Sequence, residues 1–309
     1  MSDMKTVLVT GANAGLGRQA TLQLASLPGV QRIYLACRNE DKAKAAITKL
    51  EAETGKSMFA YVQLDTSDLN SVYAAIERID APLDGIILNA GGMGGPSPTD
   101  ITPDGVTQCF AVNVLGHAAL VEGLIEASKL RGTVVYVGSE AARGIPMARI
   151  ERPALQTSST ADFAAIADGS LFSTFDAGQV YGHVKYVGTL WTSAMSRKYP
   201  ALRFVTVSPG ATTGTEGARD MSALSKFIMN RVAMPMMALF GRAHGVETGA
   251  ARYLAVLSDD VYKTGRFYAS PWPTTSGALV DQSTFFEDLG NLSFQDNAYY
   301  AVRSFLPKS

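Results

Sequence analysis

The sequence 6-TVLVTGANAGLG-17 joins a short apolar run, Thr6–Thr10, to a turn that holds Gly11, Gly15 and Gly17. The run has the composition of a strand buried on both faces. A helical pattern follows at once, so the glycines stand between a strand and a helix. In that position they let the backbone approach a pyrophosphate closely, while the helix N-terminus offers free N–H groups. The stretch predicts a dinucleotide-binding turn; the alternative is an ordinary tight strand–helix connection.

The same alternation of strand and helix continues through the first two thirds of the chain. The β-rich runs stand at 6–10, 32–36, 59–64, 85–88, 132–137 and 203–207, and helical patterns stand at 15–27, 41–53, 69–79, 107–129 and 180–197. Alternation of this kind implies right-handed βαβ units in a doubly wound parallel sheet. We therefore expect one α/β domain of Rossmann type over residues 1–309. An insertion is expected at about 143–177, and a substrate lobe with a C-terminal extension at about 211–309.

Composition excludes several classes of function. The chain has 309 residues, 47% of them apolar, and a net charge of −1, which gives no electrostatic footprint for nucleic acid or anionic membranes. Two isolated cysteines, Cys37 and Cys109, are typical of a reducing compartment. The three histidines are scattered, so no metal site is expected. No signal peptide or membrane span is expected, because the longest apolar stretch is 232–240. We expect a cytoplasmic protein with a small-molecule partner.

The residues after the second strand bear on the choice of dinucleotide. Arg38 follows that strand about 20 residues after the glycines, where an acidic residue would bind the ribose 2′-hydroxyl of NAD. No acid occupies 34–39, and the planar fork of an arginine suits a 2′-phosphate. The sequence therefore favours NADP(H) over NAD(H). The alternative for Arg38 is an exposed residue that caps the following helix region.

Polar residues also follow the third and fourth strands. The Asp65 carboxylate could accept a hydrogen bond from the adenine amino group. It could equally cap the next helix, as could Ser67 or Asp68. The small residues of 89–91 would let the sheet edge lie against a ribose, whereas Asn89 could simply brace neighbouring backbone. The sequence leaves these alternatives open.

A tyrosine and a lysine stand one helical turn apart in 178-GQVYGHVKYVG-188. If this stretch is helical, Tyr181 and Lys185 project from one face. An ammonium group beside a phenol favours the phenolate and lowers its pKa from about 10. The phenol could then exchange a proton with a carbonyl oxygen near neutral pH. The alternative is an ordinary surface pair.

The motifs together resemble the short-chain dehydrogenase/reductase family. The stretches TGANAGLG, LNAGG, VNVLGH, VGS, YGHVK and SPG occur in that family's order, up to about residue 215. The resemblance implies a catalytic tetrad of Asn113, Ser139, Tyr181 and Lys185. In it Ser139 orients and polarises the substrate oxygen, and Asn113 holds a water beside Lys185.

The resemblance also implies that Pro209–Gly210 lines the nicotinamide and that Thr212 or Thr213 contacts the cofactor. The nicotinamide supplies the hydride, so the protein mainly positions the two reactants and polarises the substrate. With the positions argued above, the predicted cofactor-binding residues are Gly11, Asn13, Gly15, Leu16, Gly17, Arg38, Asp65, Asn89, Ala90, Gly91, Tyr181, Lys185, Pro209, Gly210, Thr212 and Thr213.

Within the family, the C-terminal third resembles the branch of retinol dehydrogenases and light-dependent protochlorophyllide reductases. Ser139 and Tyr181 are 42 positions apart, which indicates an insertion over the active-site mouth. Protochlorophyllide reductases generally carry a cysteine where this chain has Ala211. The five methionines between 221 and 237 could form a flexible wall for a bulky apolar ligand, or simply core or interface.

The sequence therefore predicts an NADP(H)-dependent oxidoreductase that moves a hydride to or from a bulky apolar carbonyl or alcohol. One alternative is protochlorophyllide-reductase-like reduction of a C=C bond in a tetrapyrrole. Another is a non-catalytic NADP-binding sensor or scaffold. Family members are often homo-oligomers, although the retinol-dehydrogenase-like branch includes monomers, so either state is compatible with the sequence.

Overall fold

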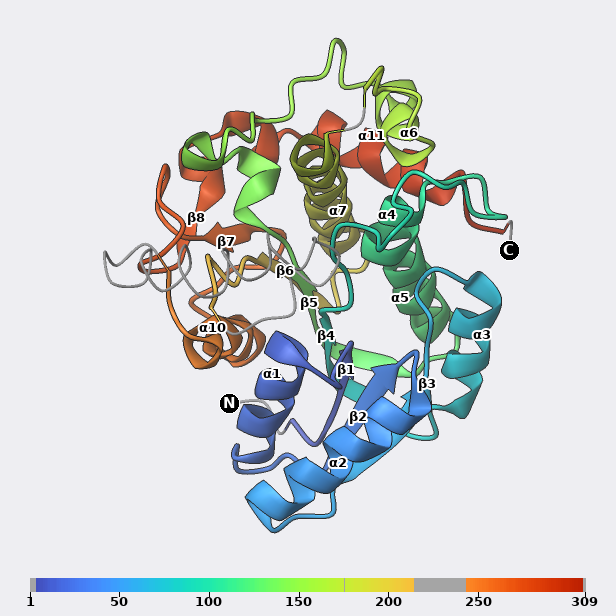
Figure 1. Cartoon of the computed structure of the whole chain (residues 1–309), viewed down its shortest axis with the longest axis vertical. Coiled ribbons are helices and arrows are strands. Elements are labelled where there is room, and N and C mark those ends of the chain that lie inside the picture. The colour runs from blue at the N-terminus through green and yellow to red at the C-terminus, as the bar shows by residue number, and fades with distance from the viewer. Residues whose placement is uncertain (1–3, 175, 214–242, 308–309) are drawn as a thin grey trace.

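One eight-stranded sheet forms the centre of the protein (Figure 1). The structure, a computed structural model, describes residues 4–174, 176–213 and 243–307. Strand order across the sheet is β3-β2-β1-β4-β5-β6-β7-β8, and all neighbours are parallel except β7 and β8. The bounds are β1 Thr6–Thr10, β2 Arg32–Cys37, β3 Phe59–Gln63, β4 Leu83–Leu88, β5 Leu130–Val137, β6 Arg203–Val207, β7 Phe267–Ala269 and β8 Val280–Asp281.

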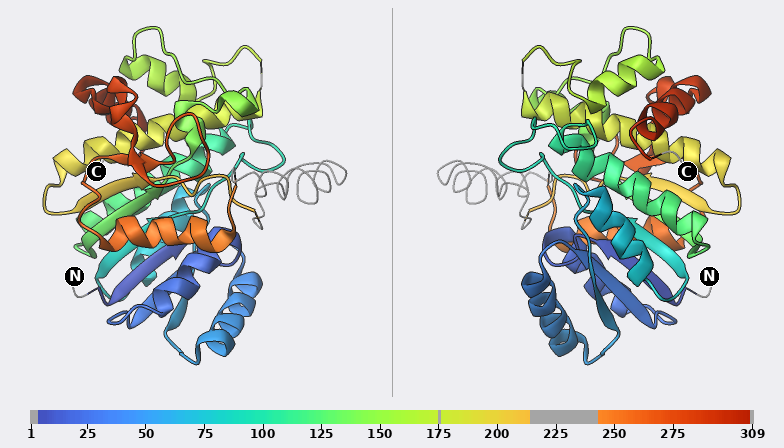
Figure 2. Two further views of the ribbon diagram at one scale, coloured as in Figure 1. Left: turned by 90° about the vertical axis from the view of Figure 1, so that its left-hand side faces the viewer. Right: turned by 90° about the vertical axis from the view of Figure 1, so that its right-hand side faces the viewer.

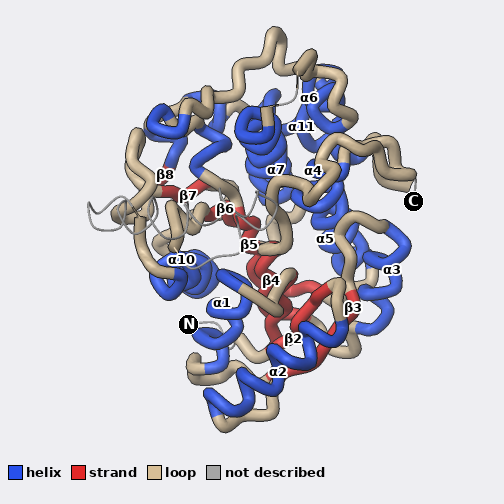
Figure 3. Tube along the Cα trace, in the orientation of Figure 1, coloured by secondary structure: helices blue, strands red, loops and turns tan. Residues whose placement is uncertain are grey.

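Helices cover both faces of the sheet, which confirms the predicted doubly wound fold (Figures 1 and 2). One face carries α1 (Gly15–Ala25), α2 (Glu40–Thr54) and α10 (Val246–Ser258). The other carries α3 (Leu69–Arg78), α5 (Gly116–Glu126) and α7 (Ala177–Lys198), and outside them lie α6 (Thr160–Ala167) and α11 (Leu292–Arg303). Figure 3 shows the strands enclosed between these layers. Two hydrophobic cores result, one on each face.

The central strands are apolar because both of their faces are covered. All five residues of β1 are buried, and β1 pairs with β2 on one side and with β4 on the other. The chain therefore changes direction across the sheet beside β1. In open α/β sheets, ligands bind at this switch point, outside the carboxyl ends of the strands.

The helix expected at 107–129 is built of three consecutive pieces. A short helical turn, α4 (Gln108–Phe110), leads into a π-helical turn over Ala111–Leu115, and α5 follows. By length and mean hydropathy the stretch Gln108–Glu126 could cross a membrane, but 78% of it is buried inside the protein. Its apolar character is therefore that of a core helix.

The segment 143–174, part of the expected insertion, is attached to the rest of the protein. Its α6 packs against α7 and α11, with Phe163 fully buried in the core. Arg152 pairs with Asp288 of the C-terminal third, and the hydroxyl of Tyr186 on α7 donates to the same carboxylate. One acid thus joins the insertion, the C-terminal third and α7. The methionine-rich segment lies outside the described residues.

Candidate active site

The glycine turn after β1 packs closely against the end of β4. Gly11 has a φ of +66°. A Cβ on Gly17 would stand 2.4 Å from the Gly11 carbonyl oxygen and 2.6 Å from Nδ2 of Asn89, so only glycine fits there. Asn89 donates through Nδ2 to the carbonyl oxygen of Thr10 at 2.9 Å. The bracing role considered for Asn89 is therefore present in the structure.

The first turn of α1 is suited to an anion. Its N-cap residue Ala14 supplies no side-chain hydrogen bond, and the first turn contains no acidic residue. Free N–H groups at a helix N-terminus attract phosphate. The main-chain N–H groups of Ala12 and Asn13 instead donate to the Cys37 thiol, whose pKa burial raises to about 11. Leu16 reaches toward Gly249 of α10. A dinucleotide pyrophosphate therefore fits beside Gly15–Gly17.

Arg38 and Asp65, predicted to contact different parts of the nucleotide, lie side by side. Arg38 Nη1 is 3.7 Å from Asp65 Oδ2, and the Arg38 side chain is 68% exposed. The helix caps are other residues: Asn39 caps α2 and Asp68 caps α3. Asp65 does not cap α3, because its Oδ1 accepts from the N–H and the hydroxyl of Ser67. The Arg38 guanidinium thus stands largely in solvent beside the Asp65 carboxylate.

The hydroxyls of Ser139 and Tyr181 meet because α7 packs closely against the turn after β5. Ser139 begins the 3-10 turn Glu140–Arg143, and a Cβ on Gly182 of α7 would stand 2.8 Å from the Ala141 carbonyl oxygen. The Ser139 hydroxyl lies close enough to the Tyr181 phenol to lower the pKa of that phenol. Both residues are partly exposed, so a substrate oxygen could approach the pair.

Lys185 lies behind this pair and is 2% exposed. Its Nζ donates to the Val137 carbonyl oxygen at 2.8 Å. The same Nζ is 5.7 Å from the ring centroid of Tyr181 and 5.0 Å from that of Tyr136. The ammonium group therefore lies between two tyrosine rings, an arrangement that favours a cation.

The pKa expected for Tyr181 is corrected by the structure. Burial is the largest cause and raises the pKa of Tyr181 above its ordinary value, while the nearby Ser139 hydroxyl lowers it by a smaller amount. Burial also lowers the pKa of Lys185 to about 7. Desolvation disfavours the charged forms of both side chains, and the Lys185 ammonium group is not among the groups that lower the pKa of Tyr181. The phenol is held protonated.

The low pKa of Lys185 predicts a pH dependence of stability. An unfolded lysine titrates near 10.4, well above the folded value of about 7. Between about pH 7 and 10.4 the unfolded chain therefore binds more protons at this side chain, so the free energy of unfolding should rise with pH. Denaturant unfolding from pH 6 to 10 should show this rise, and Lys185→Met should remove it. Lys49→Met, on the exposed face of α2, is the control. Parallel profiles for the wild type and Lys185→Met would contradict the assignment.

Asn113 is fully buried in the π-helical turn and clamps the loop after β4. Its Nδ2 donates to the carbonyl oxygens of Gly92 at 2.7 Å and Cys109 at 2.8 Å. Its Oδ1 accepts from the Gly92 N–H at 3.1 Å. Both side-chain amide groups of Asn113 are therefore engaged by main-chain atoms, which hold the loop after β4 against the π-helical turn.

The loop after β6 is held by its own hydroxyls and by His244. Thr212 Oγ1 donates to the Gly210 carbonyl oxygen at 3.0 Å, and Thr213 Oγ1 donates to that of His244 at 3.3 Å. The His244 imidazole is 2.7 Å, through Nε2, from the Pro209 carbonyl oxygen. In this arrangement both threonines stabilise the loop that was predicted to line the nicotinamide.

A buried charged cluster behind Ser139 was not predicted from the sequence. Glu140 accepts from the hydroxyls of Ser208 and Ser270, and its Oε1 is 3.8 Å from Arg252 Nη1. Arg143 is 1% exposed and donates to main-chain oxygens of Ser270 and Thr274. The cluster joins the turn after Ser139 to the end of β6. The acidic residue in VGSEAA was a signal, because a buried carboxylate requires partners.

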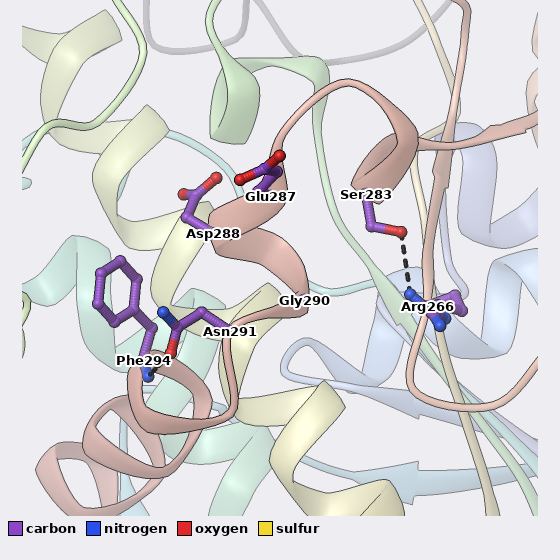
Figure 4. A pocket seen from close by; sticks show the side chains of 7 residues that line it. All are labelled: Arg266, Ser283, Glu287, Asp288, Gly290, Asn291 and Phe294. Atoms are coloured by element: carbon purple, nitrogen blue, oxygen red, sulfur yellow. Dashed lines mark hydrogen bonds between the residues drawn. The ribbon is translucent and has the colours of Figure 1, made fainter.

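A separate hollow of about 480 Å³ lies at the C-terminal third (Figure 4). Figure 4 shows Arg266 donating to Ser283 on one side and the carboxylates of Glu287 and Asp288 on the other. None of the residues predicted for the active site lines this hollow. Over residues 4–174, 176–213 and 243–307, no group of three His, Cys, Asp or Glu side chains is placed to hold a metal ion.

Residues 5–150, which include the glycine turn and Ser139, match the protein family described as short chain dehydrogenase. The chain belongs to the short-chain dehydrogenase/reductase family. It is 31% identical over 212 residues to a short-chain dehydrogenase/reductase of Armillaria gallica, a match that covers 67% of this chain and 65% of that protein. Mouse retinol dehydrogenase 12 is 38% identical over 128 residues, which cover 40% of this chain and 39% of that protein. The matched part is thus less than two thirds of either relative.

Other relatives support the predicted branch of the short-chain dehydrogenase/reductase family. Human retinol dehydrogenase 11 is 32% identical over 199 residues, which cover 63% of this chain and 56% of that protein. Among solved structures, salutaridine reductase from Papaver somniferum has a TM-score of 0.61 at 19% identity, with 85% of this chain and 99% of that chain covered. NADPH-dependent 3-quinuclidinone reductase from Rhodotorula rubra has a TM-score of 0.60 at 21% identity, with 86% and 91% covered. At such identities the two structures support the fold alone.

Proposed function

We propose that this protein is an NADP(H)-dependent oxidoreductase that interconverts a bulky apolar carbonyl compound and its alcohol. The observation that carries the proposal is the meeting of the Ser139 and Tyr181 hydroxyls in front of a buried lysine. Both hydroxyls lie at the end of the sheet to which the glycine turn belongs. Similarity to proteins named retinol dehydrogenase supports an apolar substrate.

In this proposal the protein positions a carbonyl oxygen between two hydroxyl groups. Ser139 and Tyr181 both donate to it, which stabilises the negative charge that develops there during reduction. The bound nicotinamide supplies the hydride. Tyr181 gives its proton to the oxygen as the C–O π-bond breaks, so that an alcohol forms. Its raised pKa keeps the proton available at neutral pH.

Lys185 returns a proton to Tyr181 in this scheme. With a pKa near 7, its ammonium group is a proton donor matched to neutral pH. A water on the Asn113 main-chain carbonyl would connect it to solvent. Gly15–Gly17 would hold the pyrophosphate, and Arg38 would bind the 2′-phosphate.

The direct test is turnover with NADPH. Purified protein should oxidise NADPH, followed by its absorbance, with all-trans-retinal or another long apolar aldehyde. It should do so poorly with acetaldehyde. Turnover of protochlorophyllide only under illumination would favour the tetrapyrrole alternative. Binding of NADPH without turnover of any carbonyl, alcohol or tetrapyrrole would favour the sensor or scaffold and contradict the proposal.

Arg38 should determine the preference for NADPH over NADH. Because a hydrogen bond to a charged group contributes about 1.5–3 kcal/mol, Arg38→Gln should raise the KM for NADPH about tenfold or more and leave that for NADH nearly unchanged. Arg32→Gln is the matched control, because Arg32 stands at the other end of β2 in a similar exposed pair with Asp80. Equal effects of the two substitutions on both cofactors would refute the role of Arg38.

A further inference from the structure

His117 is a fully buried histidine on α5, one turn after Asn113. Its Nδ1 is 3.2 Å from the Asn113 main-chain carbonyl oxygen, and its Nε2 is 3.1 Å from Thr10 Oγ1. The imidazole therefore connects the π-helical turn to the end of β1, where the glycine turn begins. Neither the tetrad nor the cofactor-binding residues predicted from the sequence include it.

The partners of His117 determine which ring nitrogen carries the proton. A carbonyl oxygen can only accept, so Nδ1 must donate. Burial, and to a smaller extent the charge of Lys185, lowers the pKa of His117 to about 3. The ring is thus neutral, and Nε2 must accept from the Thr10 hydroxyl. Thr10 Oγ1 in turn accepts from the Ala90 N–H at 2.8 Å. Its other potential acceptor, the Ile87 carbonyl oxygen, is farther away at 3.5 Å.

This chain of hydrogen bonds ends beside the buried lysine. A Cβ built on Gly91 would stand 2.4 Å from Asn113 Oδ1 and 3.6 Å from Lys185 Nζ, so the asparagine and the ammonium group border the same point. The Tyr136 ring lies under the lysine and meets the His117 ring edge to face, at 6.4 Å between centroids. His117 therefore borders the lysine environment.

We propose that His117 is a positioning residue that fixes the orientation of the Asn113 main-chain carbonyl. The proposal rests on the proposed function, in which that carbonyl holds the water next to Lys185. A carbonyl oxygen has two lone pairs, so the His117 N–H occupies one and leaves the other for water. The same imidazole also hydrogen-bonds to Thr10, whose hydroxyl oxygen accepts from the N–H of Ala90, a predicted cofactor-binding residue. Without its donor, the carbonyl would lose its fixed direction and proton return to Tyr181 would slow.

Two amide substitutions separate the two sides of the imidazole. The amide nitrogen of His117→Asn stands near the position of Nδ1 and can still donate to Asn113. The longer His117→Gln places its amide near Nε2 and keeps only the contact with Thr10. Loss of one hydrogen bond is worth about tenfold, so we expect kcat to fall about tenfold in His117→Gln and to stay near wild type in His117→Asn. The KM for NADPH should change little in either variant.

The kinetic outcomes are distinct. If His117→Gln kept the wild-type kcat and His117→Asn lost it, the contact with Thr10 would be the one that matters, and the proposal would be overturned. Equal retention or equal loss by both variants would reduce His117 to packing and also overturn it. Circular dichroism and thermal unfolding of each variant would establish that folded protein is compared.

The tautomer gives a test that does not depend on turnover. Imidazole nitrogen-15 shifts in the wild type should report a proton on Nδ1 and a neutral ring down to about pH 5. A proton on Nε2, or titration near the ordinary pKa of ~6.5, would overturn the proposal. By contrast, the expected tautomer in a protein that reduces no carbonyl would leave the His117–Asn113 link standing and contradict the proposed function.

Discussion

Replacing Tyr181 with phenylalanine should lower kcat by about 10²–10⁴-fold, the range typical of a lost general acid. The substitution removes one hydroxyl and keeps the ring, so the aromatic contact with Lys185 at 5.7 Å should persist. The KM for NADPH should therefore change little, and the Tm should stay near that of the wild type. Steady-state kinetics with the best aldehyde found, together with NADPH binding by fluorescence, would measure both effects.

Tyr253→Phe provides the matched control. Tyr253 is also a buried tyrosine, on α10, and the described residues supply no hydrogen-bond partner for its hydroxyl. Removing this hydroxyl should leave turnover unchanged. If Tyr181→Phe kept more than half of the wild-type kcat, the proton would come from another donor and the proposed role of Tyr181 would fail.

Replacing Glu140 with leucine should destabilise the protein by about 3–5 kcal/mol, the cost typical of breaking a buried ion pair by removing one partner. The substitution would leave the guanidinium group of Arg252 buried without its carboxylate. The hydroxyls of Ser208 and Ser270 would lose their acceptor as well. Urea unfolding followed by circular dichroism would give the change in free energy of unfolding.

Two comparisons make the Glu140 result specific. Glu287→Gln, at an exposed acid of the C-terminal third, should not change the urea midpoint measurably. Glu140→Gln keeps an acceptor for the hydroxyls of the two serines. Its free energy of unfolding should therefore lie between those of Glu140→Leu and the wild type. If Glu140→Leu lowered the free energy of unfolding by less than about 1 kcal/mol, the cluster would be more hydrated than its burial indicates. Exposed ion pairs contribute no more than that.

The regular part of the fold was predictable because its signals are local. An apolar run followed by Gly11, Gly15 and Gly17 predicted β1 and the glycine turn. Five further β-rich runs predicted the strands from β2 to β6. β7 and β8 were not predicted, because three and two residues are too few to show a period. The π-helical turn at Ala111–Leu115 was also missed, since one extra residue in a hydrogen-bonded turn leaves no mark in an apolar pattern.

The site was predicted where a motif carries it and missed where tertiary contacts create it. Tyr181 and Lys185 were singled out by their spacing, but the directions of their pKa shifts depend on burial that no spacing reveals. Arg38 and Asp65 each had a plausible role, yet their pairing needed two strands to end side by side. His117 carried a readable signal: a polar side chain within the apolar run NVLGHAAL must find a partner if the helix is buried.

The carboxylate of Asp288, which binds Arg152 of the insertion and Tyr186 of α7, has a consequence for protein engineering. Loops that set substrate choice are commonly exchanged between relatives as independent modules. Here the insertion shares an anchor with the helix that carries Tyr181, and the anchor itself comes from the C-terminal third. A graft that replaced Arg152 alone would leave Asp288 with half of its partners and loosen the catalytic helix. A functional chimaera would need to carry the insertion and the Glu287–Gly290 turn together.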